Sequence, residues 1–188
     1  MNRQRFLLSA AGTSAAALAN PWSIAGAATD DDLAFANFGV SAEFLLKDYY
    51  TRALARRQFT GARASVLRTG RTAAIRHATA LGTMLTDAAD APPLEEDFEF
   101  VWPARAFRTQ AATVGTGLTL LRALLGAYQT AAAQASTPDY RTLFASLGAS
   151  LGQQIGALSA LSAPAGAEPF PVAVDIEAAS RILEPYLG

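Results

Sequence analysis

Apolar residues recur at spacings of three and four through most of the chain, a pattern that predicts long helices with one buried face. In the first such segment, Phe35, Phe38, Leu45 and Tyr49 fall on one face. Pro103 suits the first turn of a later helix, where a missing N–H costs nothing. Four long helices are expected at about 30–58, 61–89, 103–134 and 139–161, and a short helix at about 175–183.

The arrangement of these helices predicts an all-α fold. No segment alternates convincingly with a period of two, so no sheet is expected. In the second helix, Leu67, Ile75 and Leu81 are expected on the buried side. The connection between the second and third helices is the longer one. These features predict a ferritin-like four-helix bundle with up-down-down-up topology, followed by the short C-terminal helix.

The fourth helix carries Gly148, Gly152 and Gly156 at four-residue intervals. This spacing places the three glycines on one face of the helix. Because small residues allow a neighbouring helix to approach, we expect close packing along this face. A ligand cleft is the alternative interpretation.

The N-terminal residues 1–27 have the pattern of a secretory signal. Arg3 and Arg5 precede an apolar, Ala-rich run, and Ala25-Gly26-Ala27 is a small-x-small cleavage site. The segment resembles a twin-arginine signal, but Gln4 separates the two arginines, so the twin-arginine and general secretory routes both stay open. The run is too short for a membrane anchor. We expect a domain at 28–188, exported to the periplasm or another extracytoplasmic site.

Composition excludes several classes of function. The net charge of −1 gives no basic field for binding nucleic acid. Without cysteine there is no disulfide, thiol nucleophile or zinc–thiolate site. His77 is the single histidine, which excludes histidine-rich metal sites and leaves little room for a Ser-His-Asp hydrolase.

Several stretches, taken in their order along the chain, resemble bacterial ferritin-like proteins related to desiccation-associated proteins. The first helix is similar in its apolar run leading to Glu43 and in the following Tyr49-Tyr50 pair. The similarity covers nearly all of the chain after residue 27 and depends on the order and spacing of the stretches. The matching stretches are 33–45, 76–78 with Leu81, 98–103, 123–127, 153–157 and 170–187.

The resemblance implies a di-iron carboxylate centre, which takes a Glu from each of two helices and a Glu-x-x-His from each of the other two. Carried over by position, only Glu43 and His77 survive. The other four positions hold Ala74, Gly117, Gln153 and Gly156. One carboxylate and one imidazole do not neutralise two divalent cations in a dry core. We therefore expect the di-metal centre, whether iron or manganese, to be lost.

Three interpretations of Glu43 and His77 remain. They could form a buried hydrogen-bonded or ionic pair, a remnant that holds the first helix against the second. They could form one weak metal site completed by water, Gln153 or Gln154. Alternatively, the alignment is shifted and one or both residues are exposed.

The function expected from the sequence is that of a non-catalytic bundle protein with a structural or binding role in the periplasm or cell envelope. The alternative is a degenerate metal-binding protein or oxidoreductase that uses Glu43 and His77, with iron or manganese as cofactor. The sequence identifies no partner and predicts no membrane span after signal cleavage. A homodimer through a Gly- and Ala-rich helix face is compatible with the composition.

Overall fold

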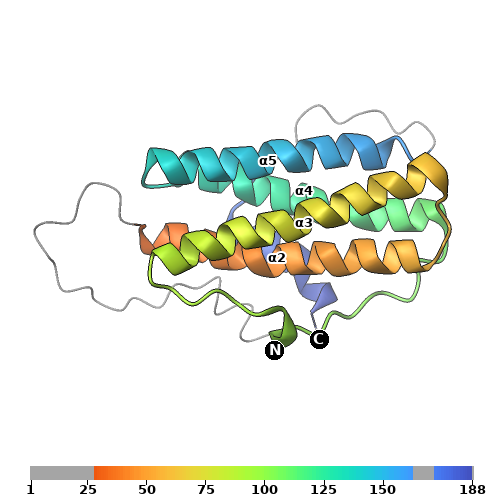
Figure 1. Ribbon diagram of the computed structural model, residues 1–188, viewed down its shortest axis with the longest axis horizontal. Coiled ribbons are helices and arrows are strands. Elements are labelled where there is room, and N and C mark those ends of the chain that lie inside the picture. Colours follow the sequence, from red (N-terminus) through yellow and green to blue (C-terminus); the bar gives the residue numbers. More distant parts are fainter. Residues whose placement is uncertain (1–27, 163–171, 188) are drawn as a thin grey trace, which may run out of the picture.

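Four long helices form the body of the protein (Figure 1). The structure is a computed structural model that describes residues 28–162 and 172–187. The expected signal at 1–27 therefore lies outside the described residues. The elements are α2 (Asp30–Ala55), α3 (Gly61–Asp87), η1 (Glu95–Asp97), α4 (Gln110–Gln134), α5 (Pro138–Ser159), α6 (Ile176–Leu183) and η2 (Glu184–Tyr186).

The helices pack as two antiparallel pairs, α2 with α3 and α4 with α5. The long connection at 88–109 carries the chain back along the bundle, so α3 and α4 run in the same direction (Figure 1). This confirms the all-α, up-down-down-up prediction. Within the described ranges, strand pairing is limited to an isolated bridge between Phe100 and Leu187.

The third long helix begins at Gln110, so the predicted start near Pro103 was wrong. The Thr109 side chain accepts a hydrogen bond from the Ala112 N–H at 3.1 Å and caps the helix there. The preceding residues form turns instead, and they bury Phe107 against Trp102 with ring centroids 5.0 Å apart. Aromatic packing at the end of the bundle therefore displaces the helix start.

Ile75, predicted to be buried, is 43% exposed. The buried face of α3 passes through Leu67, Ala74, His77 and Leu81, and Ile75 lies next to this face rather than on it. No described helix combines the length and apolar composition needed to cross a bilayer.

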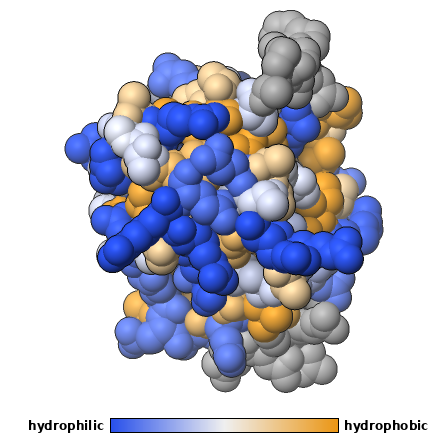
Figure 2. Space-filling model, turned by 90° about the vertical axis from the view of Figure 1, so that its right-hand side faces the viewer, coloured by the Kyte–Doolittle hydropathy of each residue, from blue (hydrophilic) through white to orange (hydrophobic). Residues whose placement is uncertain are grey.

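The two ends of the bundle carry opposite charge. Figure 2 views the bundle from the end where α2 finishes and α3 begins, and hydrophilic side chains cover much of that surface. Positive and negative groups are separated along the long axis, so the charge is unevenly distributed although the net charge is only −1. The first end carries Arg52, Arg56, Arg57, Arg63, Arg105 and Arg108, and the opposite end carries Asp30, Asp31, Asp32, Asp87, Asp90 and Asp139.

Asp32 is buried and ties the start of α2 to the turn between α4 and α5. Its carboxylate accepts hydrogen bonds from the N–H and hydroxyl of Thr29, both at 2.9 Å. It also accepts from the N–H of Ser136 at 3.1 Å and from the Ser136 hydroxyl. Burial alone would raise the pKa of Asp32, but the bonds from Ser136 and Thr29 outweigh burial and hold the pKa below its usual value.

We expect Asp32→Ala to lower the free energy of unfolding by about 1–3 kcal/mol, because it removes a helix cap and leaves buried donors unpaired. The carboxylate stabilises the fold above the unfolded-state pKa of 3.8, and this contribution is lost as pH falls. Urea unfolding at neutral and acidic pH measures both effects. The exposed Asp31→Ala is the matched control; an equal loss in both variants would contradict the assignment.

Candidate functional site

The centre of the bundle holds a buried carboxyl group, that of Glu43 on α2. Its Oε1 lies 2.9 Å from Nδ1 of His77 on α3 and accepts a hydrogen bond from the Tyr128 hydroxyl of α4 at 3.1 Å. Its Oε2 is buried and has no hydrogen-bond partner among the described residues. Glu43 thus joins three helices through one oxygen atom.

Burial favours the neutral form of the Glu43 carboxyl group. The side chain is fully enclosed, and desolvation raises its pKa above 4.5, although the bonds from His77 and Tyr128 favour the charged form. Burial also raises the pKa of Tyr128, and the nearby Glu43 adds to that effect. Tyr128 therefore stays protonated and serves as a hydrogen-bond donor.

His77 links this centre to α5. Its Nε2 lies 2.9 Å from the hydroxyl oxygen of Ser150. A neutral imidazole satisfies all of these contacts if Nδ1–H donates to Glu43 and Nε2 accepts from Ser150. The four side chains of Glu43, His77, Tyr128 and Ser150 then form one hydrogen-bonded chain across all four long helices.

Gly70 and Gly117 make room for two further tyrosines beside this chain. A Cβ atom added to Gly117 would lie 2.3 Å from the Tyr49 hydroxyl oxygen, and one added to Gly70 would lie 2.3 Å from Cζ of Tyr50. The Tyr49 hydroxyl donates to the carbonyl of Thr113 at 2.8 Å. Phenol rings therefore occupy the space beside these glycines.

Gly39 has the same role for Tyr128. A Cβ atom added there would lie 3.0 Å from the Tyr128 hydroxyl oxygen and 2.8 Å from Cδ1 of Leu81. The glycine lets the phenol reach Glu43, one turn further along α2. Any larger residue at position 39 would push this hydroxyl away from the carboxyl group.

The structure places some of the sequence-predicted ligand positions inside the bundle and others outside. Ala74 and Gly117 face the interior, as the alignment implied, but neither offers a ligand atom. Gln153 and Gly156 are exposed, so the prediction that they take the Glu-x-x-His positions of α5 was wrong. Leu147, Leu151 and Leu158 set the buried face of α5, which turns Gln153 and Gly156 outward.

The burial of the α5 glycines also depends on which face of the helix turns inward. Gly148 is buried, and a Cβ atom added to it would lie 3.4 Å from Cδ1 of Leu125. Gly152 and Gly156 are exposed, with no heavy atom within 4 Å of an added Cβ. The expected close packing therefore holds at Gly148 alone.

A di-metal centre does not fit this set of side chains. Such a centre needs several carboxylates to offset the charge of two cations. Among the described residues, no group of three or more His, Cys, Asp or Glu side chains comes together. The Tyr49 hydroxyl and Leu158 occupy the space into which a side chain at Gly117 would project. The geometry favours the first interpretation of Glu43 and His77, a buried pair.

Sequence reasoning missed Tyr128 and Ser150, and it considered Gln154 only as a ligand of a weak metal site, not as the partner of Tyr50. The sequence does indicate Tyr128, since it is the one aromatic residue in the segment 110–134. Ser150 and Gln154 lie four residues apart and therefore share a face of α5. Their role depends on which face turns inward, and the amide pair Gln153-Gln154 gives no indication of that.

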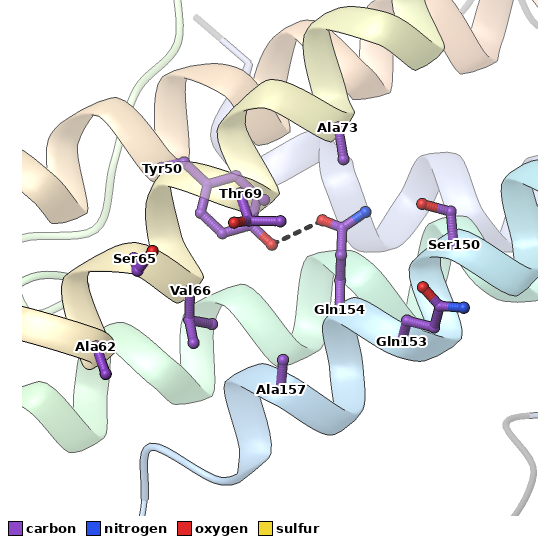
Figure 3. Close-up of a pocket in the computed structure, with 11 residues that line it drawn as sticks. Tyr50, Ala62, Ser65, Val66, Thr69, Ala73, Ser150, Gln153, Gln154 and Ala157 are labelled. Atoms are coloured by element: carbon purple, nitrogen blue, oxygen red, sulfur yellow. Dashed lines mark hydrogen bonds between the residues drawn. The ribbon is translucent and has the colours of Figure 1, made fainter.

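Tyr50 connects the centre to a cleft between α3 and α5, which Figure 3 shows. Its hydroxyl donates to Oε1 of Gln154 at 2.9 Å. The cleft has a volume of about 520 Å³ and reaches Ser150, the partner of His77. The buried network therefore has one side that approaches solvent.

We expect Glu43→Gln to remove a pH-dependent part of the stability. Because the folded-state pKa is raised, Glu43 contributes its full stabilisation below pH 4.5, and this contribution declines as pH rises through the folded-state pKa. The stability of the wild type relative to Glu43→Gln should therefore fall on going from acid to neutral pH. Denaturant unfolding across this range measures it, and a constant or rising difference would contradict the raised pKa.

Comparison with known proteins identifies the fold family. A search of curated proteins and a search of solved structures each returned no match. The family model described as a ferritin-like domain matches residues 31–163, which include the four long helices except for Asp30 and include the Glu43–His77 pair. The chain therefore belongs to the ferritin-like domain family.

Proposed function

We propose that the protein is an exported, non-catalytic member of this family with a binding or structural role in the periplasm or cell envelope. One observation carries the proposal: Tyr49 and Leu158 occupy the space beside Gly117 where a metal-binding member would place a carboxylate. The resemblance of residues 33–45 and 123–127 supports placing it among the bacterial, desiccation-associated proteins.

Electrostatics support the absence of a redox metal pair. Two divalent cations bring about four positive charges, which need several carboxylates in a water-free core. Glu43 is the sole acidic residue within reach among the described interior positions, and burial already favours its neutral form. The hydrogen-bonded chain through Glu43 and His77 then serves to hold the four helices in register.

The purified protein should contain iron and manganese at far below one atom per chain and should lack ferroxidase activity. His77→Leu should leave the metal content unchanged but lower the free energy of unfolding by about 1–3 kcal/mol, since it leaves Glu43 with one partner fewer. Elemental analysis and denaturant unfolding measure the two effects.

Glu99→Gln on the exposed connection is the control for the metal measurement. Purification with close to two metals per chain, lost in Glu43→Ala, would overturn the proposal. That result would establish the alternative function, a metal-binding protein or oxidoreductase based on Glu43 and His77.

Export gives a separate prediction, based on the signal pattern at 1–27. Protein recovered from outside the cytoplasm should begin at or near Ala28, because Ala25-Gly26-Ala27 is the cleavage motif. N-terminal sequencing measures this directly. Replacing Arg3 and Arg5 by Lys should block a twin-arginine route and leave the general route working. An intact Met1 on exported protein would contradict the cleavage site.

A further inference from the structure

The cleft between α3 and α5 exists because both helices present short side chains there. Ala62, Ala73 and Ala157 form apolar parts of its walls, with Val66 (Figure 3). Of the neighbouring pairs of long helices, α3 and α5 accordingly make the least extensive contact. The volume of the cleft, about 520 Å³, lies in the range of small-molecule sites.

Gln154 gives the cleft an unused hydrogen-bond donor. Its Oε1 is occupied by the Tyr50 hydroxyl, which fixes the orientation of the amide. Its Nε2 is buried, has no hydrogen-bond partner among the described residues, and points away from Tyr50 toward the Ala73 side of the cleft (Figure 3). Since buried polar groups are normally paired, this N–H group indicates where a ligand acceptor would bind.

A second recess continues the cleft along α3. It has a volume of about 390 Å³, shares Thr69, Ala73 and Ser150 with the cleft, and is lined by Arg68 and Arg76. Within the part of the chain that the structure describes, neither arginine forms a salt bridge. The recess therefore offers two positive charges beside an apolar wall.

No carboxylate balances these charges locally. Between Gly61 and Thr86, α3 carries four arginines and no acidic residue, and no Asp or Glu lines either cavity. On α5 the charged residues are confined to the first turn, at Asp139 and Arg141. This face of the bundle therefore attracts anions.

We propose that the joined cleft binds a small amphipathic carboxylate, an inference that gives the binding role proposed above a ligand class. The apolar body lies between Val66 and Ala157, where it displaces water from short aliphatic side chains. The carboxylate lies in the recess that Arg68 and Arg76 line, where it pairs with Arg76, and Arg68 adds a second positive charge to the recess. The Gln154 Nε2–H group donates to one oxygen of the same carboxylate.

The helical spacing sets the length of the ligand. Val66, Thr69, Ala73 and Arg76 follow each other at intervals of three or four, so they form one stripe along α3. From Val66 to Arg76 the stripe spans about 15 Å at the helical rise per residue. A medium-chain fatty acid or an aromatic carboxylate of similar length matches this span.

Isothermal titration of the purified protein with decanoate, below its micelle-forming concentration, tests the proposal. We expect saturable binding of one molecule per chain, and about tenfold weaker binding of decanol, which keeps the chain and lacks the carboxylate. The double variant Arg68→Gln/Arg76→Gln should weaken decanoate binding about tenfold and leave decanol binding unchanged. Ala73→Phe should abolish binding of decanoate and of decanol, because the phenyl ring would occupy the space where the two cavities meet.

Arg71→Gln is the matched control, since Arg71 is an exposed arginine of the same helix that lines neither cavity. Circular dichroism confirms that each variant folds; if Ala73→Phe does not, the arginine variants decide. Absence of saturable decanoate binding, or equal weakening by Arg71→Gln and by the double variant, would overturn the proposal. Metal content, measured on the same preparation, separates this failure from a failure of the proposed function.

Discussion

The packing of tyrosine rings against glycines is the constraint on which the rest of the bundle depends. Tyr49, Tyr50 and Tyr128 are almost completely buried, and each lies against a glycine of another helix. The rings fill the interior, while their hydroxyl groups require partners there. The partners are the carbonyl of Thr113, the amide of Gln154 and the carboxyl group of Glu43, so the glycines determine where polar atoms lie.

This packing accounts for the state of the bundle centre. A carboxyl group in a dry core is costly unless its pKa rises or donors surround it. Glu43 shows both responses, a raised pKa and donors from two other helices. The hydrogen-bonded chain therefore keeps a buried carboxyl group partnered and links the four long helices.

The fold could be predicted from periodicity because Leu, Phe and Tyr dominate the buried faces and Thr and Pro mark several helix starts. The start of α4 could not, because the burial of Phe107 against Trp102 competes with the helix signal at Pro103. For the site, Glu43 and His77 followed from the resemblance. The role of Gln154 in place of Gln153 depends on a rotation of α5 that Leu151 and Leu158 set, and neighbouring amides do not encode it.

At the centre, Tyr49 fills the space beside Gly117, whereas the short side chains of Ala73 and Ala157 leave the α3–α5 side open. Small residues on two facing helices leave a gap unless a large side chain from a third helix fills it. Tyr50 fills the gap only as far as Gly70, and its hydroxyl then holds the Gln154 amide with the nitrogen turned to the cleft. Ser150 lines this cleft while it contacts His77, so the cleft and the buried carboxyl group are connected through two side chains. A ligand in the cleft would therefore contact the network that holds the four helices together.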